Sequence, residues 1–210
     1  MYLNNFRAPQ GSLVFGGFDT AKFSGTFQTV PLSADPDEQF RTFFVPWTSF
    51  TFDQGVASNN TGKRNDTTGT NCKMNLAPGR GLPDALIDSG DPAFSLPAVL
   101  IKAMGKVVGA KVANGTLTPI PCTAGDSGAK FTVGFANAVN IDVPLLMLLL
   151  RITDGNGKPV TNRQGQKLCQ LPVEVSETSS TLGAPFMQAA YIRTWGDSDE
   201  GNLGISLRAS

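Results

Sequence analysis

Carboxylates, hydroxyls, lysines or a cofactor have to carry any chemistry of this chain. Its 210 residues include no histidine and only three cysteines, with no CxxC pair. The chain therefore lacks the imidazole base of Ser-His-Asp and Cys-His catalysis, and it offers no imidazole zinc site and no usual cysteine cluster for a metal. Asp88 stands out because apolar Ala85-Leu86-Ile87 leads directly into Asp88-Ser89-Gly90-Asp91. A carboxylate between a short strand and a glycine turn is suited to being held in place for acid–base chemistry.

Two other aspartates share part of this pattern. Asp19-Thr20 follows a glycine pair and precedes Ala21 instead of glycine, which indicates a structural turn. Asp126-Ser127-Gly128 repeats the tripeptide, but Gly125 precedes it and no apolar strand leads in, so we expect a loop. With Gly125 the segment also mimics the signature around a serine-protease nucleophile, an interpretation that fails without a histidine base.

The elements that must position Asp88 are expected to be strands. Short apolar runs broken by turn residues, with 23 glycines, 14 prolines and 14 phenylalanines, favour an all-β protein. One helix is expected over 97–109, where apolar residues recur at helical spacing between Pro97 and Gly109. Strands are expected over 11–19, 26–32, 41–53 (a strand pair or one long bent strand), 85–87, 131–135, 139–150, 173–175, 189–194 and 203–207, with a hairpin turn over 154–157.

The organisation of the chain indicates a single domain over residues 1–210, without an internal repeat. Lys+Arg and Asp+Glu balance at 17 each, so no electrostatic footprint for nucleic acid or an anionic membrane is visible. The longest apolar run, Val143 to Leu150, is too short for a membrane span. Residues 55–69 are polar and are expected to form a surface loop.

Three N-glycosylation sequons occur, at Asn59, Asn65 and Asn114. Chance accounts for some sequons in a chain rich in Asn and Thr, but two in one polar loop favour a secreted or vacuolar glycoprotein.

Five segments, taken in order, resemble the C-terminal half of the pepsin-like aspartic proteases, most of all the fungal secreted and yapsin-like members. They are the opening segment 11–23, the apolar-apolar-Asp-Ser-Gly motif 86–90 with the Pro-led helix after it, the cysteines Cys122 and Cys169, the Leu-Gly-x-x-Phe-x-x-x-Tyr-like segment 182–191, and the last strand 203–207. An Asp-Ser-Gly tripeptide alone is a weak signal, but here order and spacing agree over nearly the whole chain.

The resemblance implies an all-β fold, the C-terminal lobe of a bilobal acid protease with one or two short helices. It implies an aspartic endopeptidase that cleaves a peptide or protein substrate through aspartate-activated water, with no metal and no cofactor. In that family one aspartate from each lobe faces the other, and the pair shares a proton at acid pH. Asp88 is then the catalytic aspartate of this lobe, Ser89 bonds toward the opposing loop, and Gly90 supports the turn. The alternative is that Asp88 merely caps a turn. Cys122 and Cys169 are then the lobe's disulfide, which implies an oxidising compartment.

The sequence departs from the family first by having no second strand-led Asp-Ser/Thr-Gly. We therefore expect the N-terminal lobe to be a partner missing from this chain, and the chain alone to be inactive. A homodimer that pairs two Asp88 residues is a less favoured alternative, and a truncated product without a function of its own is another.

The second departure is Asp91, where the family usually has Ser or Thr. Either its charge disturbs the site, or its side chain turns outward and caps the turn, and the sequence favours neither. The first case supports the rival function, a catalytically dead homologue that binds peptides or proteins. Thr181, in place of an apolar residue, is a third and milder departure that affects packing behind the loop.

The parent protein is expected to be extracellular or in the vacuolar or secretory pathway. The first residues of the chain lack an apolar stretch long enough for a signal peptide, which agrees with a fragment whose true start lies upstream. Cys72 is left over from the expected disulfide, and it is either free or paired outside this chain.

Overall fold

The computed structural model describes residues 1, 3, 10–23, 26–34, 42–55, 73–77, 81–136, 139–196 and 203–209, with backbone alone for 195, 196 and 203–209. Its strands are β1 (Gln28–Val30), β2 (Phe44–Val45), β3 (Trp47–Asp53), β4 (Lys73–Asn75), β5 (Ala85–Ile87), β6 (Phe94–Leu96), β7 (Val112–Ala113), β8 (Thr116–Leu117), β9 (Ile120–Pro121), β10 (Lys130–Phe135), β11 (Asn140–Pro144), β12 (Leu150–Arg151), β13 (Leu168–Gln170), β14 (Val173–Val175), β15 (Ser180–Leu182), β16 (Ala190–Gly196) and β17 (Leu203–Ala209). Its helices are α1 (Ala98–Val108) and α2 (Ala184–Ala189), with 3-10 helices η1 (Thr20–Lys22), η2 (Cys122–Ser127) and η4 (Leu145–Leu148). The all-β fold class is confirmed.

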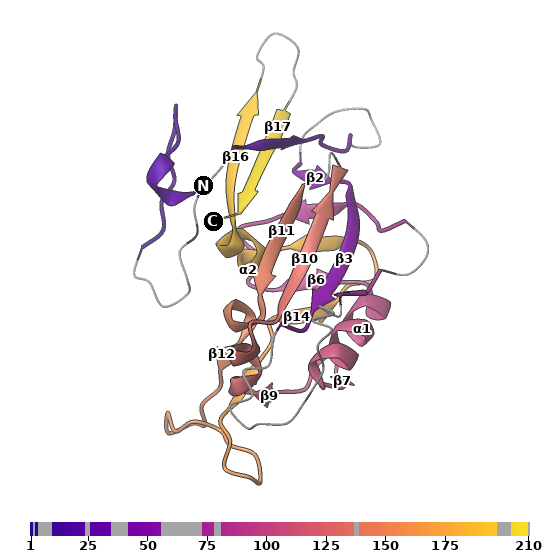
Figure 1. Ribbon diagram of the computed structural model, residues 1–210, viewed down its shortest axis with the longest axis vertical. Helices are drawn as coiled ribbons and strands as arrows, with labels where there is room; N and C mark the ends of the chain where they lie inside the picture. Colours follow the sequence, from indigo (N-terminus) through magenta and orange to yellow (C-terminus); the bar gives the residue numbers. More distant parts are fainter. Residues whose placement is uncertain are drawn as a thin grey trace, which may run out of the picture.

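The strands form four sheets (Figure 1), and two of them matter most for the candidate site. The larger runs β2-β5-β15-β6-β14-β8-β7, and within it β5 is parallel to β15 while β6 is parallel to β14. The second runs β11-β10-β3-β4 and is antiparallel throughout. The remaining sheets are β1-β17-β16, at the upper end of Figure 1, and β12-β13-β9, toward its lower end.

Aromatic side chains on β3 and β10 fill the centre of the core. Phe50 stacks on Phe131 with ring centroids 5.5 Å apart, and Phe52 lies 4.9 Å from the same ring. A register shift between Gly134 and Phe135 of β10 lets Trp47 also be buried, although it is an odd number of residues from Phe50. The Trp47 indole N–H donates to the carbonyl of Pro83, which ties this sheet to the segment that enters β5.

Helix α1 forms where the periodic apolar residues predict a helix. Pro97 precedes it in an extended conformation, and its buried residues include Leu100, Ile101 and Met104. The helix ends at Gly109, whose left-handed backbone donates to the carbonyl of Gly105. Its contacts with β14 and β8 place it over the larger sheet.

Two of the predicted strands differ in the structure. No strand forms over 11–19: the segment makes a single β-bridge at Ser12, and no strand in the described part of the chain pairs with it over a longer run. The segment instead bends at residues 15–17, with Leu13 and Phe15 exposed. The predicted strand 139–150 is interrupted by η4 after Pro144, so it becomes β11, a 3-10 turn and β12.

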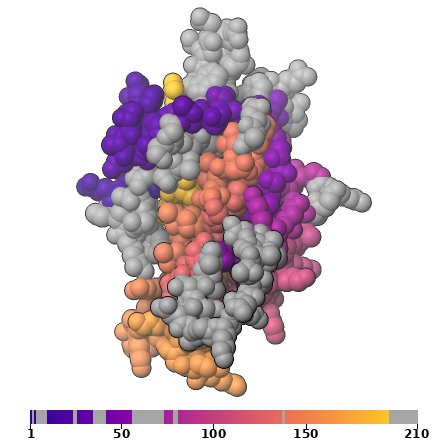
Figure 2. All heavy atoms as spheres, in the orientation of Figure 1, coloured from indigo at the N-terminus to yellow at the C-terminus, as the bar shows by residue number. Residues whose placement is uncertain are grey.

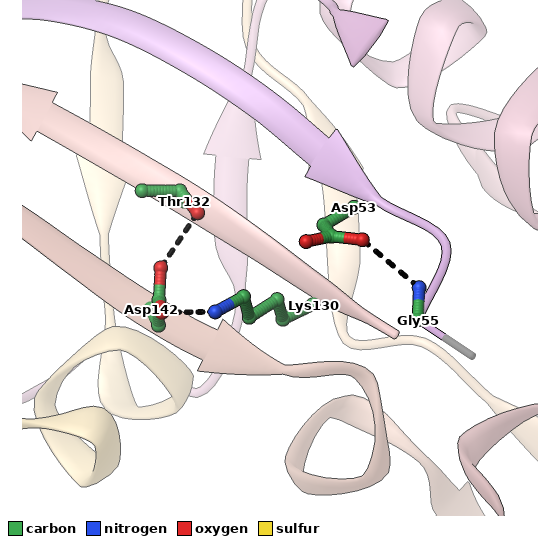
Figure 3. Close-up of polar contacts among 5 residues, drawn as sticks. All are labelled: Asp53, Gly55, Lys130, Thr132 and Asp142. Carbon is green, nitrogen blue, oxygen red and sulfur yellow. Dashed lines mark hydrogen bonds and ion pairs between the residues drawn. The ribbon is translucent and has the colours of Figure 1, made fainter. Parts of the chain in front are cut away.

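A row of charged side chains crosses four strands: Lys73 on β4, Asp53 on β3, Lys130 on β10 and Asp142 on β11. Lys130 lies 2.5 Å from Asp142, and the Thr132 hydroxyl donates to the other oxygen of the same carboxylate at 2.6 Å (Figure 3). Burial raises the pKa of Asp142, but the hydrogen bonds from Lys130 and Thr132 and the charges of Lys130 and Lys73 together hold that pKa below its usual value. The hydrogen bond to Asp142 raises the pKa of Lys130.

Candidate functional site

Asp88 follows directly on β5, which is hydrogen-bonded on both sides. Leu86 pairs with Phe44 of β2, and Ile87 pairs with Leu182 of the parallel strand β15. Beyond the strand, the Asp88 amide still donates to the Leu182 carbonyl at 3.4 Å. Because Ala85 and Ile87 are buried, the strand is anchored and the half-buried Asp88 emerges from it at a defined place.

The loop that follows holds the carboxylate of Asp88 through a backbone group. The Gly90 amide donates to Asp88 Oδ1 at 2.7 Å, while Ser89 and Gly90 are both exposed. A Cβ on residue 90 would come 3.2 Å from the same oxygen, so glycine gives the carboxylate room. One oxygen of Asp88 is thus held by a backbone amide, which orients the carboxylate.

Gly183 supports this loop from the neighbouring strand end. It is the residue between β15 and α2, and the Ala184 amide at the start of α2 donates to the Asp91 carbonyl at 2.7 Å. A Cβ on residue 183 would come 2.3 Å from the carbonyl oxygens of both Asp91 and Ala93. The glycine of the Leu-Gly pattern in segment 182–191 is therefore required by packing, because only glycine lets this segment approach the Asp88 loop so closely.

Asp91 uses its carboxylate to organise the loop. Oδ1 accepts from the Ala93 amide at 2.8 Å, and Oδ2 accepts from the Ser95 hydroxyl at 2.9 Å. Ser95 is buried in β6 and also lies 2.8 Å from Glu174 Oε1 on β14. The contact with the Ala93 amide fits the alternative in which Asp91 caps the turn, but the side chain does not turn outward as that alternative expected, because its other oxygen reaches the buried Ser95.

Ser95, Glu174 and Gly183 are therefore structural partners of the loop that the sequence prediction missed. The glycine could have been found, since it belongs to the Leu-Gly pattern. Nothing in the sequence signals the contact between Ser95 and Glu174, because the two residues are 79 positions apart.

A cavity of about 640 Å³ borders the Asp88 loop. Ile87 and Ser89, the neighbours of Asp88, belong to its lining, and Asp88 itself does not. Apolar side chains from three parts of the chain complete the wall: Leu13, Val14, Phe15 and Phe18 from the opening segment, Phe43 before β2, and Met187, Tyr191 and Ile192 from α2 and β16. Phe15 is 87% exposed, so this wall is open to solvent.

The other aspartate patterns lie in turns. The Asp19 carboxylate accepts from the Ala21 amide as the N-cap of η1, and the Asp19 amide donates to the Tyr191 hydroxyl. Asp126 and Ser127 lie in η2, where the Ser127 hydroxyl donates to the Ala124 carbonyl and accepts from the Ala129 amide. No described strand ends at either aspartate, so Asp88 differs from both in its setting.

The remaining predicted site residues are placed as follows. Cys122 and Cys169 form a disulfide, with Cα atoms 5.0 Å apart. Asn114 is exposed at the turn between β7 and β8, with a positive φ of 50°. Asn59, Asn65, Cys72 and most of the loop 55–69 lie outside the described residues. Within the described part of the chain no three His, Cys, Asp or Glu side chains gather as a metal site, and no helix is long and apolar enough to cross a membrane.

Comparison with known proteins agrees with this geometry. The chain is 29% identical to a probable aspartic-type endopeptidase OPSB of Arthroderma benhamiae, over 91% of this chain and 36% of that protein. It is 29% identical to secreted aspartic protease 6 of Candida albicans and 27% identical to barrierpepsin of Saccharomyces cerevisiae, over 91% of this chain and 38% and 29% of those proteins. The chain thus spans about a third of the length of the curated relatives it matches. The family model for eukaryotic aspartyl proteases matches residues 1–207, and the chain belongs to that family.

Proposed function

We propose that this chain supplies one of the two catalytic aspartates, Asp88, of an aspartic endopeptidase. The observation that supports this most is the setting of Asp88: a half-buried carboxylate at the end of an anchored strand, held by the Gly90 amide beside an open cavity. In the active enzyme one carboxylate takes a proton from water while the other, protonated, polarises the substrate carbonyl.

The second carboxylate comes from a segment outside these 210 residues. Asp88 is the only aspartate in the described part of the chain that follows a strand and precedes Ser-Gly. A single carboxylate can act as base but has no acid partner, so the proposal includes that the isolated chain does not cleave peptides. The share of about a third of each relative's length supports a further lobe in the parent protein.

The apolar wall of the cavity supports the same proposal. Leu13, Val14, Phe15 and Phe18 are each at least 42% exposed and lie together with Phe43 and Met187. Water contact on such a cluster is unfavourable, and a contiguous apolar surface of this kind marks a place that another protein part covers. We assign it to the missing N-terminal lobe, which would also close the site over Asp88.

The rival function, a catalytically dead binding module, rested on the charge of Asp91. Both oxygens of that carboxylate are engaged by Ala93 and Ser95. That arrangement supports an active parent, with Asp91 as a residue that shapes the loop.

The substrate class and the location follow from the family. We propose peptide or protein substrates, and a parent protein in the secretory pathway, as the name of secreted aspartic protease 6 states for that relative. The disulfide Cys122–Cys169 supports an oxidising compartment. The exposed Asn114 supports N-glycosylation there, which a mass shift on glycosidase treatment, absent in Asn114→Gln, would test.

The experiment is a peptide-cleavage assay at acid pH, with and without pepstatin. We expect no inhibitor-sensitive turnover by the isolated chain, and turnover once the upstream half of the parent is co-expressed with it. Inhibitor-sensitive turnover by the isolated chain would overturn the need for a second lobe. Inactivity of the complete parent on any peptide mixture would instead favour the binding module.

A further inference from the structure

Residues 151–167, here named the arm, connect β12 to β13 and extend away from the sheets at the lower end of the molecule (Figure 1). The same segment is visible as orange spheres at the lower end of the surface in Figure 2. None of its residues lines the cavity beside the Asp88 loop. The arm is therefore a feature that the proposed proteolytic function does not use.

The backbone of the arm is ordered by its own hydrogen bonds. Two tight turns close it: the Gly157 amide donates to the Asp154 carbonyl, and the Gly165 amide donates to the Asn162 carbonyl, each at 3.0 Å. In addition, the Val160 amide donates to the Ile152 carbonyl at 3.1 Å. The arm thus presents its side chains from fixed positions, which lowers the entropy cost of binding a partner.

The base of the arm is anchored as well. Strands β12, β13 and β9 form one sheet, and Cys169 of β13 is joined by the disulfide to Cys122, which follows β9.

The arm carries a strong local charge in a chain whose formal net charge is zero. It has four cations, Arg151, Lys158, Arg163 and Lys167, all exposed, and a single carboxylate, Asp154. One oxygen of Asp154 is turned back on the turn, where it accepts from the amides of Asn156 and Lys158 at 2.9 Å. No ion pair in the described part of the chain joins an arm cation to a carboxylate. The four cations are available to an outside anion.

The other exposed side chains of the arm narrow the class of partner. Asn156, Gln164 and Gln166 add amide groups that can bond to hydroxyls and carboxylates. The arm contains no aromatic residue, which removes the base-stacking platforms of single-strand nucleic-acid binders and the aromatic anchors of membrane interfaces. Its four cations are spread from Arg151 to Lys167, so its partner carries repeated anions rather than a single charge.

We propose that the arm binds an acidic polysaccharide, a chain of sugar rings carrying carboxylate or sulfate groups. Four exposed cations on a segment ordered by its own hydrogen bonds match repeated anions along such a polymer, and the amide side chains match its hydroxyls. The partner is held outside the protease site, so the arm serves to attach the protein to an anionic carbohydrate matrix.

The test measures binding of the chain to immobilised polygalacturonate and dextran sulfate at pH 6, in 50 and 150 mM salt. We expect saturable binding that weakens as salt rises, because the contacts are ionic. The variant Lys158→Gln/Arg163→Gln/Lys167→Gln is expected to weaken binding about tenfold, since each lost surface ion pair contributes about twofold. The matched control, Lys102→Gln/Lys106→Gln/Lys111→Gln, removes the same charge from α1 and the residues just after it, and it is expected to change binding less than about twofold.

Three results would overturn the proposal. One is the absence of saturable binding by the unaltered chain at 50 mM salt. Another is an equal loss in both triple variants, which would reduce the effect to net charge. The third is tighter binding to phosphatidylserine vesicles or duplex DNA than to either polysaccharide, which would assign the arm another partner. Circular dichroism of both variants confirms that each is folded, which is expected because all six side chains are exposed.

Discussion

The residues around Asp88 divide into Asp88 itself, which we propose carries the chemistry, and several that hold it in place. The Gly90 amide fixes one carboxylate oxygen, and Asp91 ties the loop to β6 through Ser95. Gly183, which follows β15, lets this strand end pack closely against the loop. The loop therefore depends on atoms from segments that are nearly a hundred residues apart.

Gly183→Ala is predicted to destabilise the chain by about 1–3 kcal/mol. Its Cβ would lie 2.3 Å from two backbone carbonyl oxygens, which cannot move aside as a side chain could. Urea unfolding at neutral pH measures the change. Gly155→Ala is the matched control, because a Cβ there meets no atom within 4 Å. Equal stability of the two variants would show that the loop does not pack against Gly183 as described.

Two substitutions of Asp91 test whether its side chain holds the loop through Ala93 and Ser95. Ser95 has one hydroxyl hydrogen for two carboxylates, Asp91 and Glu174. In Asp91→Asn the new amide can donate to Ser95 while the side-chain oxygen still accepts from Ala93, so we expect unchanged or slightly increased stability. Asp91→Ala loses both bonds and is expected to cost about 1–2 kcal/mol in urea unfolding. A larger cost for Asn than for Ala would contradict the capping role.

At the scale of elements, much of the fold follows from patterns in the sequence. The apolar spacing between Pro97 and Gly109 predicts α1 to within a residue at each end, and Ala85-Leu86-Ile87 predicts β5. The opening segment 11–19 was predicted wrongly as a strand: its consecutive apolar residues Leu13-Val14-Phe15 form no ladder with a strand in the described part of the chain. Sequence periodicity reports which side chains avoid water but not which neighbour covers them.

The candidate site shows the same limit. Asp88 and its glycine were within reach of the sequence because they belong to a short motif, and the Cys122–Cys169 pair followed from the family resemblance. The contacts of Ser95 with Glu174, and of Gly183 with the loop carbonyls, join residues that only the parallel pairing of β5 with β15 and β6 with β14 brings together. No short sequence pattern predicts which strands pair in parallel.

The charged row on β10 and β11 predicts a pH dependence of stability. Because the pKa of Asp142 is lowered in the folded chain, its ionised form stabilises the fold above the unfolded pKa of about 4, and this contribution is lost as pH falls through the folded value. Asp142→Asn should therefore cost less than about 1 kcal/mol at pH 6, as Lys130 and Asp142 are both partly exposed, and nothing at the lowest pH. Urea unfolding at several pH values, with Asp84→Asn as the exposed control, measures this. A cost that grows as pH falls would contradict it.

The disulfide at the base of the arm is predicted to contribute more to the free energy of unfolding than any surface ion pair. It joins residues 47 positions apart, and the chain-entropy model gives about 4 kcal/mol for a loop of this length. Cys122→Ala/Cys169→Ala should lose up to that amount in urea unfolding, while hydrogen exchange should show that the backbone hydrogen bonds within the arm, which precedes β13, stay formed. Stability equal to that of the unaltered chain would show that the cross-link does not constrain the unfolded state.

At the scale of the whole molecule, the proposal is that this chain is one part of a larger protein. A cavity of about 640 Å³ opens beside the Asp88 loop, and its apolar wall includes Leu13, Val14 and Phe15, which are exposed. Relatives of the chain extend well beyond the part that it matches. Both facts are accounted for if another lobe brings the second aspartate and covers this wall.

The identity of the catalytic carboxylate tests this account most directly, because the sequence contains its own control. Asp88 and Asp126 both precede Ser-Gly, but only Asp88 follows a strand. In the complete parent protein, Asp88→Asn is predicted to lower kcat for peptide cleavage about a thousandfold or more, and Asp126→Asn to leave it nearly unchanged. Full activity of Asp88→Asn in a folded parent would contradict the account.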